Sequence, residues 1–142
     1  MSEMLANYHF INRKYCNAIP ELEVELFKNP SNNINKKKLI ICYTQSDNLQ
    51  KAIDLFIDLL LQDIDLIIDT DVEYEDCPCP DLIAMLENKT IKRESELNLF
   101  IELGILWLYC DRNESVKYFL HARKLEPSNK SLNTILNLLQ QS

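Results

Sequence analysis

The stretch that decides the fold is residues 95–127, which read SELNLFIELGILWLYCDRNESVKYFLHARKLEP. Within it a small residue, Ser115, is followed four residues later by Phe119, and Pro127 comes eight residues after that. Four residues are about one helical turn, so the first two side chains share a helix face, and a proline cannot extend the helix. The same three places recur upstream in two sets: Ala18, Leu22 and Pro30, and Ala52, Phe56 and Ile64. From Ala18 to Ala52 is 34 residues, so the spacing indicates a repeated pair of helices.

These positions resemble the tetratricopeptide repeat, a helix-turn-helix unit of about 34 residues. Leu103, Gly104 and Trp107 match the family's L-G-x2-Y, with tryptophan in place of tyrosine. The resemblance implies an all-α fold, an α-solenoid of antiparallel helix pairs with about three repeats and a C-terminal capping helix. It also implies that the first helices of the pairs line a concave groove, which binds peptides or helices of other proteins. It implies no catalytic residues.

We expect one domain over residues 1–142, with repeats at about 1–30, 33–64 and 96–127, a divergent insertion at 65–95 and a capping helix at 129–140. A helix is predicted over 14–28, with Ala18, Leu22 and Phe27 on its packing side. Pro20 implies that this helix either starts near Ala18 or is kinked. Residues 66–72 could prolong the preceding helix or form an extended piece, and periodicity does not decide between the two. Residues 69–80 are predicted to be a loop, and residues 81–87 a short helix.

Composition excludes several classes of function. Phosphate-binding loops need several glycines, and Gly104 is the only glycine in the chain. The net charge of -7 repels polyanions, so we expect no nucleic acid and no membrane as a partner. Residues 1–10 show no secretory signal, which favours a cytoplasmic protein. The apolar run 53–68 is interrupted by Asp54, Asp58 and other polar residues, which predicts a buried helix instead of a membrane span.

The predicted partner-binding groove would lie on the first helices of the second and last repeats. A related branch of the family holds chaperone tails with a clamp of cations and asparagines, but the matching places here include the acidic residues Glu3 and Glu102, so that ligand does not fit. Of the other matching places, Asn7, Lys38 and Asn98, only Asn7 agrees with the clamp. A largely apolar set would suit an amphipathic helix or an extended segment instead. The predicted groove residues are Ile34, Lys37, Ile41, Thr44, Asn98, Ile101, Ile105, Leu108 and Tyr109.

The five cysteines suit reduced thiols better than a disulfide framework, because their number is odd and three fall in helix-like segments. Cys77 and Cys79 have poor spacing for zinc, and no second pair follows. We interpret them as incidental thiols of a surface loop, or as a redox-reactive pair. The spacing of Asp69, Asp71 and Glu73 is similar to the start of a calcium-binding loop, but the glycine of such a loop is missing. We interpret His121 as an ordinary helix residue. We therefore expect no metal and no cofactor.

The leading hypothesis is a protein–protein interaction module or adaptor, not an enzyme, which binds a protein or peptide through the concave face of its repeats. The first alternative is a structural subunit that self-associates into a homo-oligomer through its apolar C-terminal helix. The second alternative is a metal-binding or redox-sensitive protein that uses the Cys77/Cys79 loop.

Overall fold

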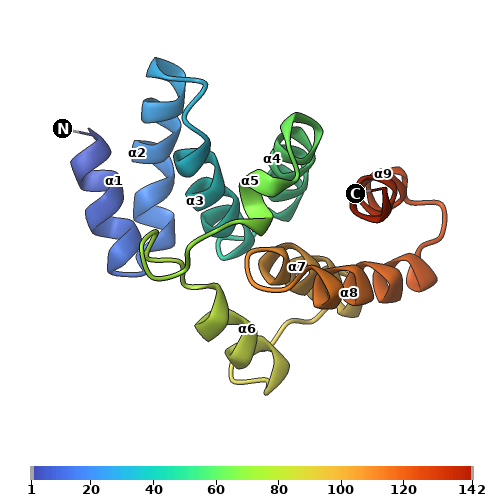
Figure 1. The fold of residues 1–142 in the computed structure, drawn as a ribbon. Helices are drawn as coiled ribbons and strands as arrows, with labels where there is room; N and C mark the ends of the chain where they lie inside the picture. The colour runs from blue at the N-terminus through green and yellow to red at the C-terminus, as the bar shows by residue number, and fades with distance from the viewer. Residues whose placement is uncertain (1, 142) are drawn as a thin grey trace. The chain divides into compact units, whose positions relative to one another are not determined.

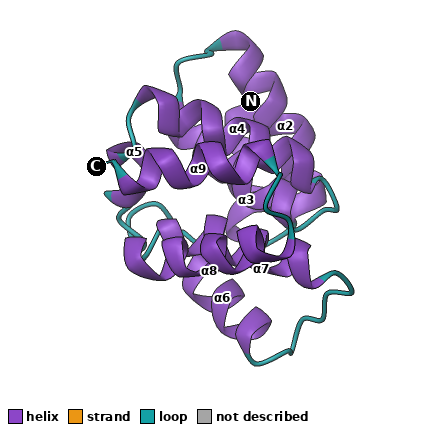
Figure 2. Ribbon diagram, turned by 90° about the vertical axis from the view of Figure 1, so that its right-hand side faces the viewer, coloured by secondary structure: helices purple, strands orange, loops and turns teal. Residues whose placement is uncertain are grey.

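The structure, a computed structural model, describes residues 2–141 and is all-α over that range (Figures 1 and 2). No strand occurs between residues 2 and 141, which confirms the predicted fold class. The helices are α1 (Ser2–Ile11), α2 (Tyr15–Lys28), α3 (Asn33–Thr44), α4 (Leu49–Gln62), α5 (Asp65–Ile68), α6 (Cys79–Glu87), α7 (Glu96–Leu108), α8 (Arg112–Leu125) and α9 (Lys130–Gln140).

The chain divides into two compact units, Met1–Leu59 and Leu60–Ser142, and the division falls within α4. In the first unit α1 packs against α2, and α2 packs against α3. In the second unit α7 packs against α6 and α8, and α8 packs against α9. Each of these packed pairs is made by helices that are neighbours in sequence, as in a helical repeat.

The first unit is built on small and apolar residues that are completely buried. Ala18 and Leu22 are both 0% exposed, as the repeat spacing predicts, whereas Phe27 is 88% exposed, so its predicted place on the packing side is wrong. The reason is helical geometry: Phe27 is five residues from Leu22, about 500° along the helix, and so points away from it. Helix α2 begins at Tyr15 and contains Pro20 in its interior, which excludes the later start.

The second unit shows why the repeat needs small residues. The Ser115 hydroxyl of α8 donates a 2.6 Å hydrogen bond to the Gly104 carbonyl of α7. A Cβ atom at Gly104 would lie 2.8 Å from the Phe119 ring, which is closer than van der Waals contact. The two helices therefore cross at a distance that only a glycine and a small residue permit.

The segment between the best-matched repeats is helical in two short pieces. Helix α4 ends at Gln62 and α5 is a separate turn over Asp65–Ile68, so residues 66–72 neither prolong α4 nor form a strand. Helix α6 begins at Cys79, two residues before the predicted start. Cys77 and Cys79 are 8% and 0% exposed, so the expectation of a surface loop at these cysteines is wrong.

Helix α9 occupies the place of the predicted capping helix. Its apolar stripe, Leu132, Ile135, Leu136 and Leu139, is no more than 1% exposed. Arg112, at the start of α8, donates to the Leu139 carbonyl near the end of α9, and this bond supplies one of the partners that a helix C-terminus lacks. The stripe that was expected to drive self-association is thus covered. The exposed large apolar side chains lie elsewhere, with Met4, Tyr8 and Ile11 on α1.

Candidate functional site

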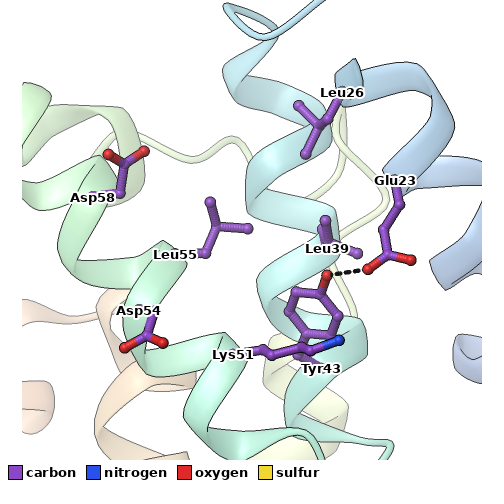
Figure 3. Close-up of a pocket in the computed structure, with 8 residues that line it drawn as sticks. All are labelled: Glu23, Leu26, Leu39, Tyr43, Lys51, Asp54, Leu55 and Asp58. Atoms are coloured by element: carbon purple, nitrogen blue, oxygen red, sulfur yellow. Dashed lines mark hydrogen bonds between the residues drawn. The ribbon is translucent and has the colours of Figure 1, made fainter. Parts of the chain in front are cut away.

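An open groove of about 480 Å³ lies in the first unit, between α2, α3 and α4 (Figure 3). Its lining comes from all three helices: Glu23 and Leu26 from α2, Leu39 and Tyr43 from α3, and Lys51, Asp54, Leu55 and Asp58 from α4. Lining residues recur at intervals of three or four along each helix, with Asp54 and Leu55 adjacent on α4, so each helix turns one face toward the groove.

The floor of the groove is apolar. Leu39 and Tyr43 are 2% and 7% exposed and form its base, while Leu26 and Leu55 are half-buried and border it. In Figure 3 the side chains of Leu26, Leu39 and Leu55 gather between the helices. Apolar side chains that remain partly accessible in a concavity favour contact with apolar groups of a ligand.

The rim of the groove is acidic, with three carboxylates, Glu23, Asp54 and Asp58, against one ammonium group, Lys51. Asp54 accepts a 3.0 Å hydrogen bond from the neutral amide of Gln50, which leaves its charge in place. Asp58 lies 3.5 Å from the Lys36 ammonium nitrogen, and the Asp58 side chain is 56% exposed. With Lys36 counted beside Lys51, three carboxylates face two ammonium groups, so the balance of charge at the rim is negative by one.

Tyr43 joins the floor to the rim. Its hydroxyl, on α3, donates a 2.6 Å hydrogen bond to Glu23 Oε2 on α2 (Figure 3). The Lys51 ammonium nitrogen lies 5.8 Å from the centre of the Tyr43 ring. Burial, and then the hydrogen bond to Glu23, raise the pKa of Tyr43 well above its usual range. The phenol therefore stays protonated at neutral pH and acts as a hydrogen-bond donor, not as a base.

The residues predicted for the groove lie elsewhere. Lys37, Ile41 and Thr44 of α3 are buried, and only Ile34 is exposed on that helix. At roughly 100° per residue, Ile41 points about 200° away from Leu39, so the predicted face of α3 is opposite to the one that lines the groove. The remaining predicted residues belong to α7 and its C-terminal end, in the other unit: Asn98 is exposed, whereas Ile101, Ile105, Leu108 and Tyr109 are buried.

None of the nine predicted residues lines the groove of the first unit, and the eight residues that do were not predicted as a site. The sequence contains a signal for two of these eight lining residues. Asp54 and Asp58 interrupt an apolar run at a spacing of four residues, which places both carboxylates on one helix face. Sequence reasoning used them only to exclude a membrane span.

Three residues at the chaperone-clamp places, Asn7, Lys38 and Glu102, make contacts within the chain. The Lys38 ammonium donates a 2.9 Å hydrogen bond to Asn7 and lies 5.5 Å from the centre of the Phe10 ring. Glu102, in the second unit, is 3% exposed and accepts from Arg93 at 2.8 Å and 3.1 Å. Both contacts hold elements of the fold together.

Of the two cysteines in the second alternative, Cys79 is poorly suited to act as a thiolate at neutral pH. Burial, followed by the nearby Cys77 thiol, raises the pKa of Cys79, and the reactive form of a cysteine is the thiolate. Among the residues whose positions are described, no group of three or more His, Cys, Asp or Glu side chains could hold a metal ion. In the calcium-like loop the Asp71 carboxylate accepts from the Tyr74 N–H, and the Asp71 N–H donates to Glu75, so these groups take part in the local turn.

The remaining candidate, His121, lies in an aromatic cluster. Its ring centre is 5.5 Å from that of Phe100 and 6.3 Å from that of Tyr118, so its contacts are those of a packed helix residue. Between residues 2 and 141, no helix combines the length and the apolar character that crossing a bilayer would require.

Comparison of the chain with known proteins gives no match to a family model, to a curated protein or to a solved structure.

Proposed function

We propose that the protein is a protein–protein interaction module, without catalysis of its own, that holds a segment of a partner protein in the groove between α2, α3 and α4. The observation that supports this most is the combination of two accessible leucines, Leu26 and Leu55, beside the apolar floor with a charged rim. Interfaces combine apolar anchors with polar rims in this way.

The repeat-like pairing of helices supports the same function. Helical repeats present extended surfaces that bind proteins, and the close crossing at Ser115 is what the tetratricopeptide resemblance predicts. The binding surface proposed here differs from the one implied by the resemblance, because it uses Leu39 and Tyr43 of α3 and not the face that carries Ile41.

We place this activity in the cytoplasm. The described cysteines are all free thiols, and free thiols are usual in a reducing compartment. A scaffold or adaptor role in the cytoplasm requires only that the protein binds a partner, without catalysis.

Affinity capture with a matched pair of variants tests the proposal. Leu26→Ser removes an apolar side chain of the groove, and the control Phe27→Ser changes the next residue of the same helix, which is 88% exposed and does not line the groove. We expect a specific partner to be recovered by the wild-type chain and by Phe27→Ser but lost by Leu26→Ser. Equal recovery of every partner by both folded variants would contradict the proposal.

A further inference from the structure

We infer that the segment held in the groove is an amphipathic helix whose apolar face is flanked by lysine or arginine. This inference rests on the proposed function and adds to it the chemistry of the partner. The charge of the rim supports the basic residues of the partner, and the helical walls of the groove support its helical form.

The charge of the rim selects a basic partner. Asp54 and Asp58 are exposed on one face of α4, and Glu23 faces them from α2 (Figure 3). Two ammonium groups offset part of this charge, and both already have partners: Lys51 lies over the Tyr43 ring, and Lys36 lies 3.5 Å from Asp58. A basic segment would meet complementary charge on both sides of the groove, whereas an acidic one would meet repulsion.

The helical walls select the form of the partner. A strand gains its main-chain hydrogen bonds from a sheet edge, and residues 2–141 offer no strand. The three walls are helices with leucines at their inner faces, and a further helix can pack its own ridge of apolar side chains between them. The partner helix would therefore carry apolar residues at i, i+3, i+4 and i+7, with cations beside them.

Three synthetic peptides test the inference directly. They are about 15 residues long, near the length at which helices become marginal in water, and share one leucine face. Their flanking residues are lysine and arginine, glutamine, or glutamate. We expect fluorescence anisotropy to show the basic peptide binding about tenfold more tightly than the acidic one at low ionic strength, with a smaller difference at high salt. Equal affinities, or preference for the acidic peptide, would overturn the inference.

The net charge of -7 attracts any basic peptide, so the position of the charges must be tested as well. The double variant Asp54→Asn/Asp58→Asn neutralises two groups of the rim, and the control Glu3→Gln/Glu73→Gln changes the net charge equally at exposed residues outside the groove. Binding of the basic peptide should weaken about fivefold in the first variant, as expected for two screened charge pairs, and should not change in the second. Equal effects of the two variants would mean that the attraction is diffuse and would overturn the inference.

A fourth peptide, the basic one with two prolines in its centre, tests the helical form. Proline prevents a continuous helix, so we expect binding to be lost. Retained affinity would overturn the helical part of the inference.

Leu55→Ser separates failure of the inference from failure of the proposed function. If it weakens all the peptides equally while charge has no influence, the groove binds apolar segments, so the proposed function stands and the inference falls. If neither Leu55→Ser nor Asp54→Asn/Asp58→Asn affects any peptide, or no peptide binds, both fall.

Discussion

At the scale of single residues, Gly104 gives the sharpest test of the packing in the second unit. In the interior of a helix, alanine normally stabilises relative to glycine by about 0.5–1 kcal/mol. Here the added Cβ would lie 2.8 Å from the ring of Phe119, which is completely buried. We therefore expect Gly104→Ala to lower the free energy of unfolding by about 1–3 kcal/mol, the usual cost of overpacking. Urea unfolding measures it, and a gain in stability would show that α7 and α8 are farther apart.

Cys42 makes stability depend on pH at the alkaline end. Burial raises the pKa of its thiol from 9.0 to about 12, so above pH 9 the unfolded chain loses this proton while the folded chain keeps it. The contribution of this thiol to the free energy of unfolding is fully present below pH 9. It decreases as the pH rises, by about 2–3 kcal/mol at pH 11. Urea unfolding between pH 7 and 11 should show this fall, and Cys42→Ala should reduce its slope above pH 9. An identical slope in the variant would contradict the burial of the thiol.

At the scale of elements, α2 carries a proline in its interior. Pro20 cannot donate the hydrogen bond that the Cys16 carbonyl would otherwise accept, and a proline costs about 3 kcal/mol relative to alanine inside a helix. We expect Pro20→Ala to raise the free energy of unfolding by about 1–3 kcal/mol, since the site is exposed and an alanine meets no obstacle. A loss of stability would indicate that α2 needs the proline for its shape.

The link between α6 and α7 contains an ion pair whose carboxylate is buried and whose arginine is partly exposed. Arg93 binds both carboxylate oxygens of Glu102, whose side chain is 4% exposed. Removing the arginine would leave that carboxylate without its bidentate partner, so Arg93→Ala should lower the unfolding free energy by about 2–4 kcal/mol in thermal or urea unfolding. Lys117→Ala is the control, because its contact with Glu114 is solvent-exposed and should contribute under about 0.5 kcal/mol. Equal effects of the two changes would contradict the burial of Glu102.

Most helices could be predicted from the sequence because their boundaries have local causes. The α3 and α9 starts follow from the side chains of Asn32 and Asn129, which accept hydrogen bonds from the backbone N–H groups of Asn35 and Leu132. Residues 65–80 could not be predicted in the same way. Periodicity cannot decide over a run as short as α5, and the buried Cys77 lies near Cys110, which is remote in the sequence.

At the scale of the whole molecule, the sequence predicted the class of fold but not the position of the candidate site. Periodicity shows that a helix has an apolar face, yet α3 is apolar on more than one side, with Leu39, Ile40, Ile41 and Cys42 all buried. Which of these faces borders an open groove depends on how neighbouring helices are placed against it. The resemblance supplied one choice, the face of Ile41, and the structure has its groove on the other.

The most direct test of the central claim is to locate the basic amphipathic peptide by NMR. The ¹H–¹⁵N spectrum of the labelled protein would be recorded as the peptide is added. If the groove is the binding site, the largest shifts should fall on residues of α2, α3 and α4 around Leu26, Tyr43 and Leu55, and the Leu55→Ser variant should lose them. Largest shifts within residues 96–140, or no saturable shift at any peptide concentration, would contradict the claim.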